Sequence, residues 1–319
     1  MRNLRRVLSF LFHLKMLAIR ATYLCIFITL FLLNWQWRVI ELKTAIVTDS
    51  TAYIPEHVRK AKNIEMIPLQ VTFNQESFAE EEELHVDEFY KRVSGTLPKT
   101  SQPPLGEFVN LYNRLAENHD EIISIHLSSG ISGTFNGSVQ ANDLVEGANV
   151  YSFDTEISCA MQGFYAVKAA ELANSGENAA NIIAELDEMK KSMRAYFMVE
   201  DLMHLSRGGR LSNAQAIVGG MLQIKPLLHF DEKVIVPFEK IRTRKKAMKR
   251  IGDLLKEDLR AGGLIQATVI HANRPEEAGK WMEQLETECP GVEFSISYFG
   301  PVIGTHLGEG AMGLGWVRK

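Results

Sequence analysis

The chain has 319 residues, 46% hydrophobic and 23% charged, which is enough apolar surface for two globular domains of ordinary size. Its formal net charge of −4 is unevenly divided, because residues 1–41 carry +5 and the rest of the chain carries −9. An acidic body argues against nucleic acid as the main partner. Cys25, Cys159 and Cys289 have no paired spacing, so neither a disulfide framework nor a zinc site is indicated, and the body is expected to be cytoplasmic.

The first 41 residues are rich in Leu, Phe and Ile, with basic residues scattered among them. The longest charge-free run, Ala21–Trp37, has 17 residues, the lower limit for a helix that spans a membrane. Tryptophans at the end of this run, with Arg38 beyond, are typical of a membrane interface. No small-residue cleavage site follows, which argues against a signal peptide. One interpretation of residues 21–37 is therefore a membrane anchor.

A second interpretation is that residues 1–41 are a mis-assigned start and that translation begins at Leu42. The stretch from Leu42 to Ser50 is typical of the opening of a cytoplasmic α/β domain. Membrane contact is then expected only through residues 1–41. The body is divided, as a prediction, into an N-terminal α/β domain over 42–160 and a C-terminal α/β domain over 161–319.

The first half of the body alternates strands with helices. Apolar runs predict strands at Ala45–Thr48, Met66–Phe73, Ile122–Leu127 and Val150–Phe153. Helices are expected from Pro55 to Lys62, from Asp87 to Val93, over Phe108, Leu111, Tyr112 and Leu115 at helical spacing, from Gly133, and from Cys159 to Asn174. The acidic run Glu80–Glu83 is interpreted as a solvated turn.

The second half repeats the alternation. Strands are expected at Ile224–His229, Lys233–Val236, Gln266–His271 and Glu293–Tyr298, with helices at Ala179–Met193, Thr243–Leu259 and Pro275–Glu288. This order predicts an α/β fold of two domains, with a parallel sheet in the N-terminal one.

Three hydroxyl-rich turns follow the first strands or precede the helices: Asp49–Thr51, Thr100–Ser101 and Ser128–Thr134. In an open α/β sheet the ligand lies outside the carboxyl ends of the strands, where such turns meet. Hydroxyl groups and free N–H groups at a helix start suit an anion. Each Ser or Thr taken singly is better explained as a helix cap, so the convergence of the turns is what favours a site.

Enzymatic alternatives have weaker support. The segment around Ser132 lacks the final Gly of G-x-S-x-G, so an acyl hydrolase that uses Ser132 and His306 is kept only as an alternative. Residues 306–313 contain a formal G-x-G-x-x-G, but too few residues follow for the helix of a dinucleotide site. No cofactor, metal or catalytic residue is predicted. His306, in this Gly-rich segment, is a candidate ligand-binding residue.

Two local basic clusters lie on the acidic body. They are Arg207–Arg210 and Arg242–Lys246. They are interpreted either as solvated faces or as a docking surface for a partner or for anionic headgroups.

Five motifs together resemble the DegV family of fatty-acid-binding proteins. They are TDSTA, KTSQP, LSSGISGT, RGGRLS and VIGTHLGEGAMGLGW, and they span essentially all of residues 44–319 in order and register. The resemblance implies two α/β domains with a long-chain fatty acid held between them. It further implies that the protein is a carrier without catalysis, which presents the bound acid to a fatty acid kinase.

The resemblance also assigns residues. It implies that Thr100 and Ser132 grip the carboxylate, that His306 is linked to the same carboxylate, and that Arg210 and Arg242 belong to a basic surface for the kinase. The terminal motif departs from the family, because Glu309 stands where Pro is usual. We expect this either to loosen the loop around His306 or to bring a second carboxylate near the headgroup.

Overall fold

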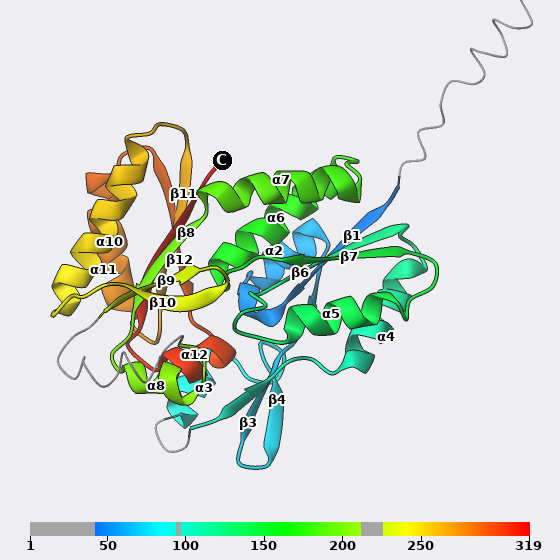
Figure 1. Cartoon of the computed structure of the whole chain (residues 1–319), viewed down its shortest axis with the longest axis horizontal. Helices are drawn as coiled ribbons and strands as arrows, with labels where there is room; N and C mark the ends of the chain where they lie inside the picture. Colours follow the sequence, from blue (N-terminus) through cyan, green and yellow to red (C-terminus); the bar gives the residue numbers. More distant parts are fainter. Residues whose placement is uncertain (1–41, 94–96, 212–225) are drawn as a thin grey trace, which may run out of the picture. The chain divides into compact units, whose positions relative to one another are not determined.

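The computed structural model describes residues 42–93, 97–211 and 226–319, and Leu42–Lys319 form one compact unit (Figure 1). The predictions for residues 1–41 lie outside the described residues. In the described ranges, no helix is both long and apolar enough to cross a membrane. The proposed boundary between residues 160 and 161 stays a prediction.

The first part of the chain forms a parallel sheet of four strands in the order β2-β1-β6-β7. These strands are β1 (Thr44–Asp49), β2 (Ile64–Ile67), β6 (Glu121–His126) and β7 (Asn149–Asp154). The helices connected to it are α2 (Glu56–Lys62), α4 (Leu105–Ala116), α5 (Thr134–Asn142), α6 (Ala160–Asn174) and α7 (Ala179–Ser192), and the short 3₁₀ helix η1 (Ser50–Ala52) follows β1.

Helices cover both faces of this sheet. Phe108 and Tyr112 of α4 pack on one face against Val47, while Tyr165 and Ala166 of α6 pack on the other. All six residues of β6 are buried, which explains why apolar residues follow one another there with few polar interruptions. The expected parallel α/β domain is therefore confirmed.

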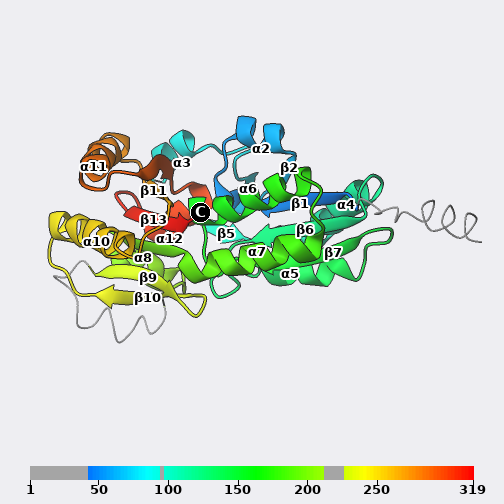
Figure 2. The same ribbon diagram turned by 90° about the horizontal axis from the view of Figure 1, so that it is seen from above.

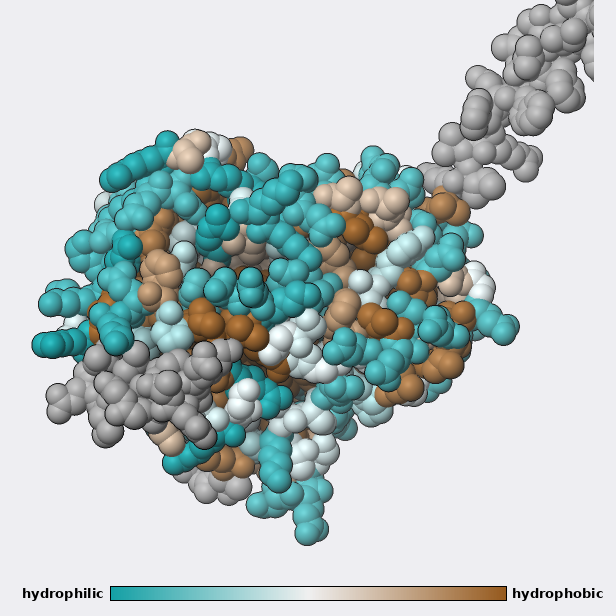
Figure 3. Space-filling model, viewed as in Figure 1, coloured by the Kyte–Doolittle hydropathy of each residue, from teal (hydrophilic) through white to brown (hydrophobic). Residues whose placement is uncertain are grey.

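Exposed hydrophobic side chains on this part include Leu105, Val139, Leu144 and Tyr151, and Figure 3 shows hydrophobic patches over α4 and α5 on an otherwise mainly hydrophilic face.

The second part forms a mixed sheet of six strands in the order β10-β9-β8-β13-β11-β12, in which only β11 and β12 pair in parallel. Its strands are β8 (Arg194–Met198), β9 (Leu227–Asp231), β10 (Val234–Glu239), β11 (Ile265–His271), β12 (Val292–Tyr298) and β13 (Met312–Arg318). Two amphipathic helices, α10 (Arg244–Leu259) and α11 (Pro275–Glu288), pack on its outer face through Ile251, Leu255, Trp281 and Leu285 (Figure 2).

A small antiparallel sheet, in the order β4-β3-β5, lies beside both larger ones. Its strands are β3 (Gln70–Phe73), β4 (Glu76–Ala79) and β5 (Lys99–Ser101), and the short helices nearby are α3 (Val86–Arg92), α8 (Leu202–Arg207) and α12 (Pro301–Leu307). Here one prediction was wrong and a second was wrong in part. Met66–Phe73 is not one strand, because it is divided between β2 and β3. Residues 81–83 do form a turn with Glu82 and Glu83 exposed, but Glu80 departs from the expected solvated turn because its side chain is completely buried.

Candidate functional site

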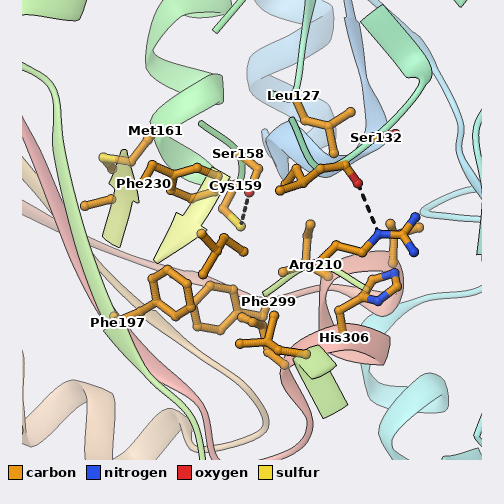
Figure 4. Close-up of a pocket in the computed structure, with 18 of the residues that line it drawn as sticks. Leu127, Ser132, Ser158, Cys159, Met161, Phe197, Arg210, Phe230, Phe299 and His306 are labelled. Carbon is orange, nitrogen blue, oxygen red and sulfur yellow. Dashed lines mark hydrogen bonds between the residues drawn. The ribbon is translucent and has the colours of Figure 1, made fainter. Parts of the chain in front are cut away.

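A cavity of about 310 Å³ lies between the carboxyl edge of the parallel sheet and the inner face of the six-stranded sheet. Ser158, Cys159 and Met161 line it from the start of α6, and Phe197, Phe230 and Gly313 line it from β8, β9 and β13. Phe299 and α12 close a further side. In Figure 4, aromatic and sulfur-containing side chains surround one end of the cavity, whereas Ser132, Arg210 and His306 lie at the other.

The polar end brings together three of the residues expected from the sequence. Thr100 comes from β5, Ser132 from the loop between β6 and α5, and His306 from the last turn of α12. Thr100 Oγ1 and His306 Nε2 are 2.8 Å apart and share a hydrogen bond across 206 positions of sequence. Ser132 lines the same cavity, and its Oγ lies 2.9 Å from Thr134 Oγ1 at the start of α5.

His306 is held in an unusual environment. Burial, together with the positive charge of Arg210, lowers the pKa of His306 to about 4, so the imidazole is neutral at pH 7. Its Nδ1 atom is buried and has no hydrogen-bond partner among the described residues. Gly208 lies against that atom so closely that a Cβ on residue 208 would be 2.4 Å from it. The ring is therefore fixed by packing on one side and by Thr100 on the other.

The two arginines assigned to a docking surface have different places. Arg210 lines the cavity, and its Nε donates to the carbonyl oxygen of Ile131 at 3.1 Å. Arg242 is exposed just before α10. The sequence did not indicate that Arg210 would add a positive charge to the polar end of the cavity, because a Gly-rich basic stretch gives no sign of burial.

The first hydroxyl-rich turn does not contribute to the cavity. Thr51 is buried and bonds Asp49 and Gln162, while Ser50 bonds Glu80 at 2.6 Å. Glu309 likewise points elsewhere, because its carboxylate pairs with Arg274 on the exposed side of the loop. Of the three turns expected to converge, only Thr100–Ser101 and Ser128–Thr134 contribute to the cavity, and α12 lines it beside them.

Among the described residues, no hydrogen bond joins a Ser to a His at this end of the cavity, as a hydrolase would need. Nε2 of His306 bonds Thr100, and Ser132 bonds Thr134 instead. A relay of Asp49, His126 and Ser124 does occur, with distances of 3.0 and 2.7 Å. All three side chains are completely buried, and Ser124 accepts a hydrogen bond from Tyr112, so this relay fastens β1 to β6 rather than facing a substrate.

Cavities of this kind are common in ligand-binding proteins, but the acidic groups that usually bind metals are not gathered here. Within residues 42–93, 97–211 and 226–319, no group of three or more His, Cys, Asp or Glu side chains is placed to hold a metal ion. The cavity offers instead a long apolar wall, hydroxyl donors, a neutral imidazole and one guanidinium. This combination suits an amphiphile with a single acidic end.

Comparison with known proteins agrees with this chemistry. Residues 43–319 match the family model described as "Uncharacterised protein, DegV family". Protein DegV of Bacillus subtilis is 59% identical over 281 residues, which cover 87% of this chain and all of that protein. Its crystal structure, described as that of a fatty acid binding protein, has a TM-score of 0.84 over the same shares of both chains. A fatty acid binding DegV family protein from Streptococcus agalactiae is 32% identical, with a TM-score of 0.80 over 87% of this chain and 99% of that one.

Proposed function

Because the chain belongs to the DegV family, we propose that it is a carrier that binds a long-chain fatty acid in the cavity between its two larger sheets. Thr100, Ser132 and His306 hold the carboxylate, and the carrier presents it to a fatty acid kinase. The observation that carries the proposal is a single cavity with an apolar wall and a Thr–His pair at one end.

The apolar wall accounts for affinity. The hydrocarbon chain of the acid contacts an apolar surface made by the buried side chains of Leu127, Met161, Phe197 and Phe299 and by the partly buried Phe230. At about 0.8 kcal/mol per buried CH₂ group, a 16-carbon acid gains roughly 11 kcal/mol before the costs of association. The cavity volume of about 310 Å³ falls at the lower end of the range of roughly 300–1,000 Å³ that ligand sites occupy.

The polar end accounts for the orientation of the acid. A buried carboxylate must be hydrogen-bonded, and hydroxyl donors bond an anion with short, strong contacts. If Nε2–H of the neutral His306 donates to Thr100 Oγ1, the Thr100 hydroxyl keeps its own hydrogen for the ligand. Arg210 adds a positive charge near that point. The carboxylate is thus bound chiefly by neutral donors, so it can be released to an enzyme without breaking a bidentate ion pair.

Access to the carboxylate supports transfer to a kinase. A second hollow of about 330 Å³ shares Thr100, Arg210 and His306 with the cavity. Its other lining residues include Lys99 and Arg207, which are exposed, so the hollow opens to solvent at the headgroup end. A basic entrance of this kind suits an approaching phosphate donor or the acidic surface of a partner.

The proposal is tested with purified protein. Mass spectrometry of an organic extract is expected to find a long-chain fatty acid in stoichiometric amount. Titration of delipidated protein with palmitate is then compared for wild type, Thr100→Val and Ser132→Ala. Loss of one hydrogen bond to a carboxylate is expected to raise the Kd about tenfold or more.

Thr72→Val is the matched control, because Thr72 lies in the adjacent strand and bonds only Ser77 on the exposed side. It is expected to bind palmitate as wild type does. An extract without acid, and no binding from a panel of fatty acids, would overturn the function. Wild-type affinity in both site variants would overturn the site while leaving the function in place.

A further inference from the structure

Glu80, at the end of β4, is a completely buried carboxyl group that the sequence placed in solvent. Three hydrogen bonds converge on it. Oε2 lies 2.6 Å from Ser50 Oγ, and Oε1 accepts from the Tyr53 hydroxyl at 3.0 Å and from the backbone N–H of Val302 at 2.6 Å. A single side chain therefore joins β4 to the segment after β1 and to the first turn of α12.

Helix α12 carries His306 in its last turn, one turn after Val302. Its two first N–H groups are both fastened to this cluster, because Ile303 N donates to the Tyr53 hydroxyl, which itself bonds Glu80. Gly300 and Gly304 allow the helix to lie directly on aromatic rings. A Cβ at Gly300 would be 2.3 Å from the ring of Tyr53. The place of α12, and with it the place of the imidazole, is set by these contacts.

Thr100, the hydrogen-bond partner of His306, lies in the same small sheet. In β3, Gln70 is opposite both Ala79 of β4 and Ser101 of β5, and the next residue, Val71, is opposite Thr100. Glu80 follows Ala79 directly. Thr100 is thus held by the ladder of the sheet, and His306 is held by Glu80 from the opposite edge of that sheet.

We propose that Glu80 is a positioning residue for fatty acid binding, which keeps His306 at hydrogen-bond distance from Thr100 by anchoring α12 to the small sheet. This inference rests on the proposed function. Glu80 does not line the cavity, so it acts on the ligand only through α12. Burial raises the pKa of Glu80 to about 8, so a neutral side chain of the same shape is the natural test of what the carboxyl contributes.

Three variants separate positioning from general stability. Glu80→Ala removes all three hydrogen bonds, whereas Glu80→Gln keeps an acceptor oxygen for Val302 and Tyr53. Glu121→Ala is the matched control, because Glu121 is also buried and its Oε2 accepts from the backbone N–H of Ala179 at the start of α7, away from the cavity. Tyr53→Phe deletes only one hydroxyl of the cluster and serves if Glu80→Ala does not fold.

Two measurements are made on each variant. Hydrogen–deuterium exchange of acid-free protein is expected to rise in residues 301–307 for Glu80→Ala and Tyr53→Phe, but not for Glu121→Ala. The Kd for palmitate is expected to rise about tenfold in Glu80→Ala and to stay within about threefold of wild type in Glu80→Gln and Glu121→Ala.

Unchanged exchange in 301–307 for Glu80→Ala or, failing that variant, for Tyr53→Phe would overturn the proposal, and so would an equal loss of affinity in Glu121→Ala. If the wild type itself does not bind palmitate, the proposed function fails, and the exchange of α12 still decides whether Glu80 anchors it.

Discussion

Replacing Gly208 with alanine is expected to weaken fatty acid binding without adding an atom to the cavity. The new Cβ would lie 2.4 Å from Nδ1 of His306, so the imidazole must retreat by about 1 Å to reach an ordinary contact. Nε2 of the same ring is 2.8 Å from Thr100 Oγ1, and a shift of that size breaks their hydrogen bond. The Thr100 hydroxyl is then no longer oriented toward the carboxylate, and a hydrogen bond to a charged group contributes about 1.5–3 kcal/mol, so the Kd for palmitate is expected to rise about tenfold or more.

The assay is isothermal titration of delipidated protein with palmitate, alongside thermal melts. Gly279→Ala is the control, because Gly279 lies in α11 and a Cβ there meets nothing within 4 Å. This control is expected to gain about 0.5–1 kcal/mol of stability and to bind palmitate normally. Gly208→Ala protein that binds palmitate as tightly as wild type would refute the reasoning, since the place of the His306 ring would then be irrelevant to the ligand.

Two further predictions concern chain length and pH. Gly313→Val adds side-chain atoms between Phe197 and Phe299, where even a Cβ would lie only 3.1 Å from Phe197 and 3.4 Å from Phe299. Palmitate is therefore expected to lose more affinity than decanoate, by about fourfold per excluded CH₂ group. Competition binding over a series of acids measures this, and equal losses at every length would contradict it. Burial raises the pKa of Glu80 from 4.5 to about 8. Between these two pH values the folded protein holds a proton that the unfolded chain has released, so the free energy of unfolding falls as the pH rises. Relative to Glu80→Gln, urea denaturation is expected to show wild type losing about 1 kcal/mol per pH unit between about pH 5 and pH 8, and parallel pH profiles would show that Glu80 is ionised throughout.

Strongly patterned segments could be predicted from the sequence. Phe108, Leu111, Tyr112 and Leu115 fall at helical spacing, and all four are buried on one side of α4. The nearly continuous apolar run at Ile122–Leu127 indicated a strand covered on both faces, and β6 is buried throughout. In both segments the pattern of apolar residues follows from which side chains are buried, and burial is what determines these elements.

Other segments could not be predicted because tertiary contacts outweigh their local pattern. Met66–Phe73 reads as one apolar run, yet β2 ends at Ile67, just before Pro68, which has no N–H for the ladder. The chain then leaves the parallel sheet and joins the small one. Strand β13 was missed because glycines alternate with its large residues, and Gly315 is required there by the close approach of Met161.

The candidate site shows the same limit. Hydroxyl-rich turns indicated that Thr100 and Ser132 lie near an anion, and the resemblance assigned His306. No local pattern indicated that Asp49–Thr51 would be used to fasten the fold instead, or that Glu80 would be buried among its neighbours. The burial of Glu80 and the pairing of Thr100 with His306 both depend on contacts between α12 and the small sheet. These contacts join residues more than 200 positions apart in the sequence.

The place of β13 has a consequence for how the protein is made. This strand is the last of its sheet along the chain, yet it lies in the interior, between β8 and β11, which do not pair with each other. While the chain is being synthesised, residues 194–198 and 265–271 emerge from the ribosome without the partner that unites them. Their pairing must wait for residues 312–318, and closing such long loops makes folding slow. Until residues 312–318 are available, the residues of β8 that line the cavity have no β13 beside them, so the cavity wall is completed only when the last strand pairs.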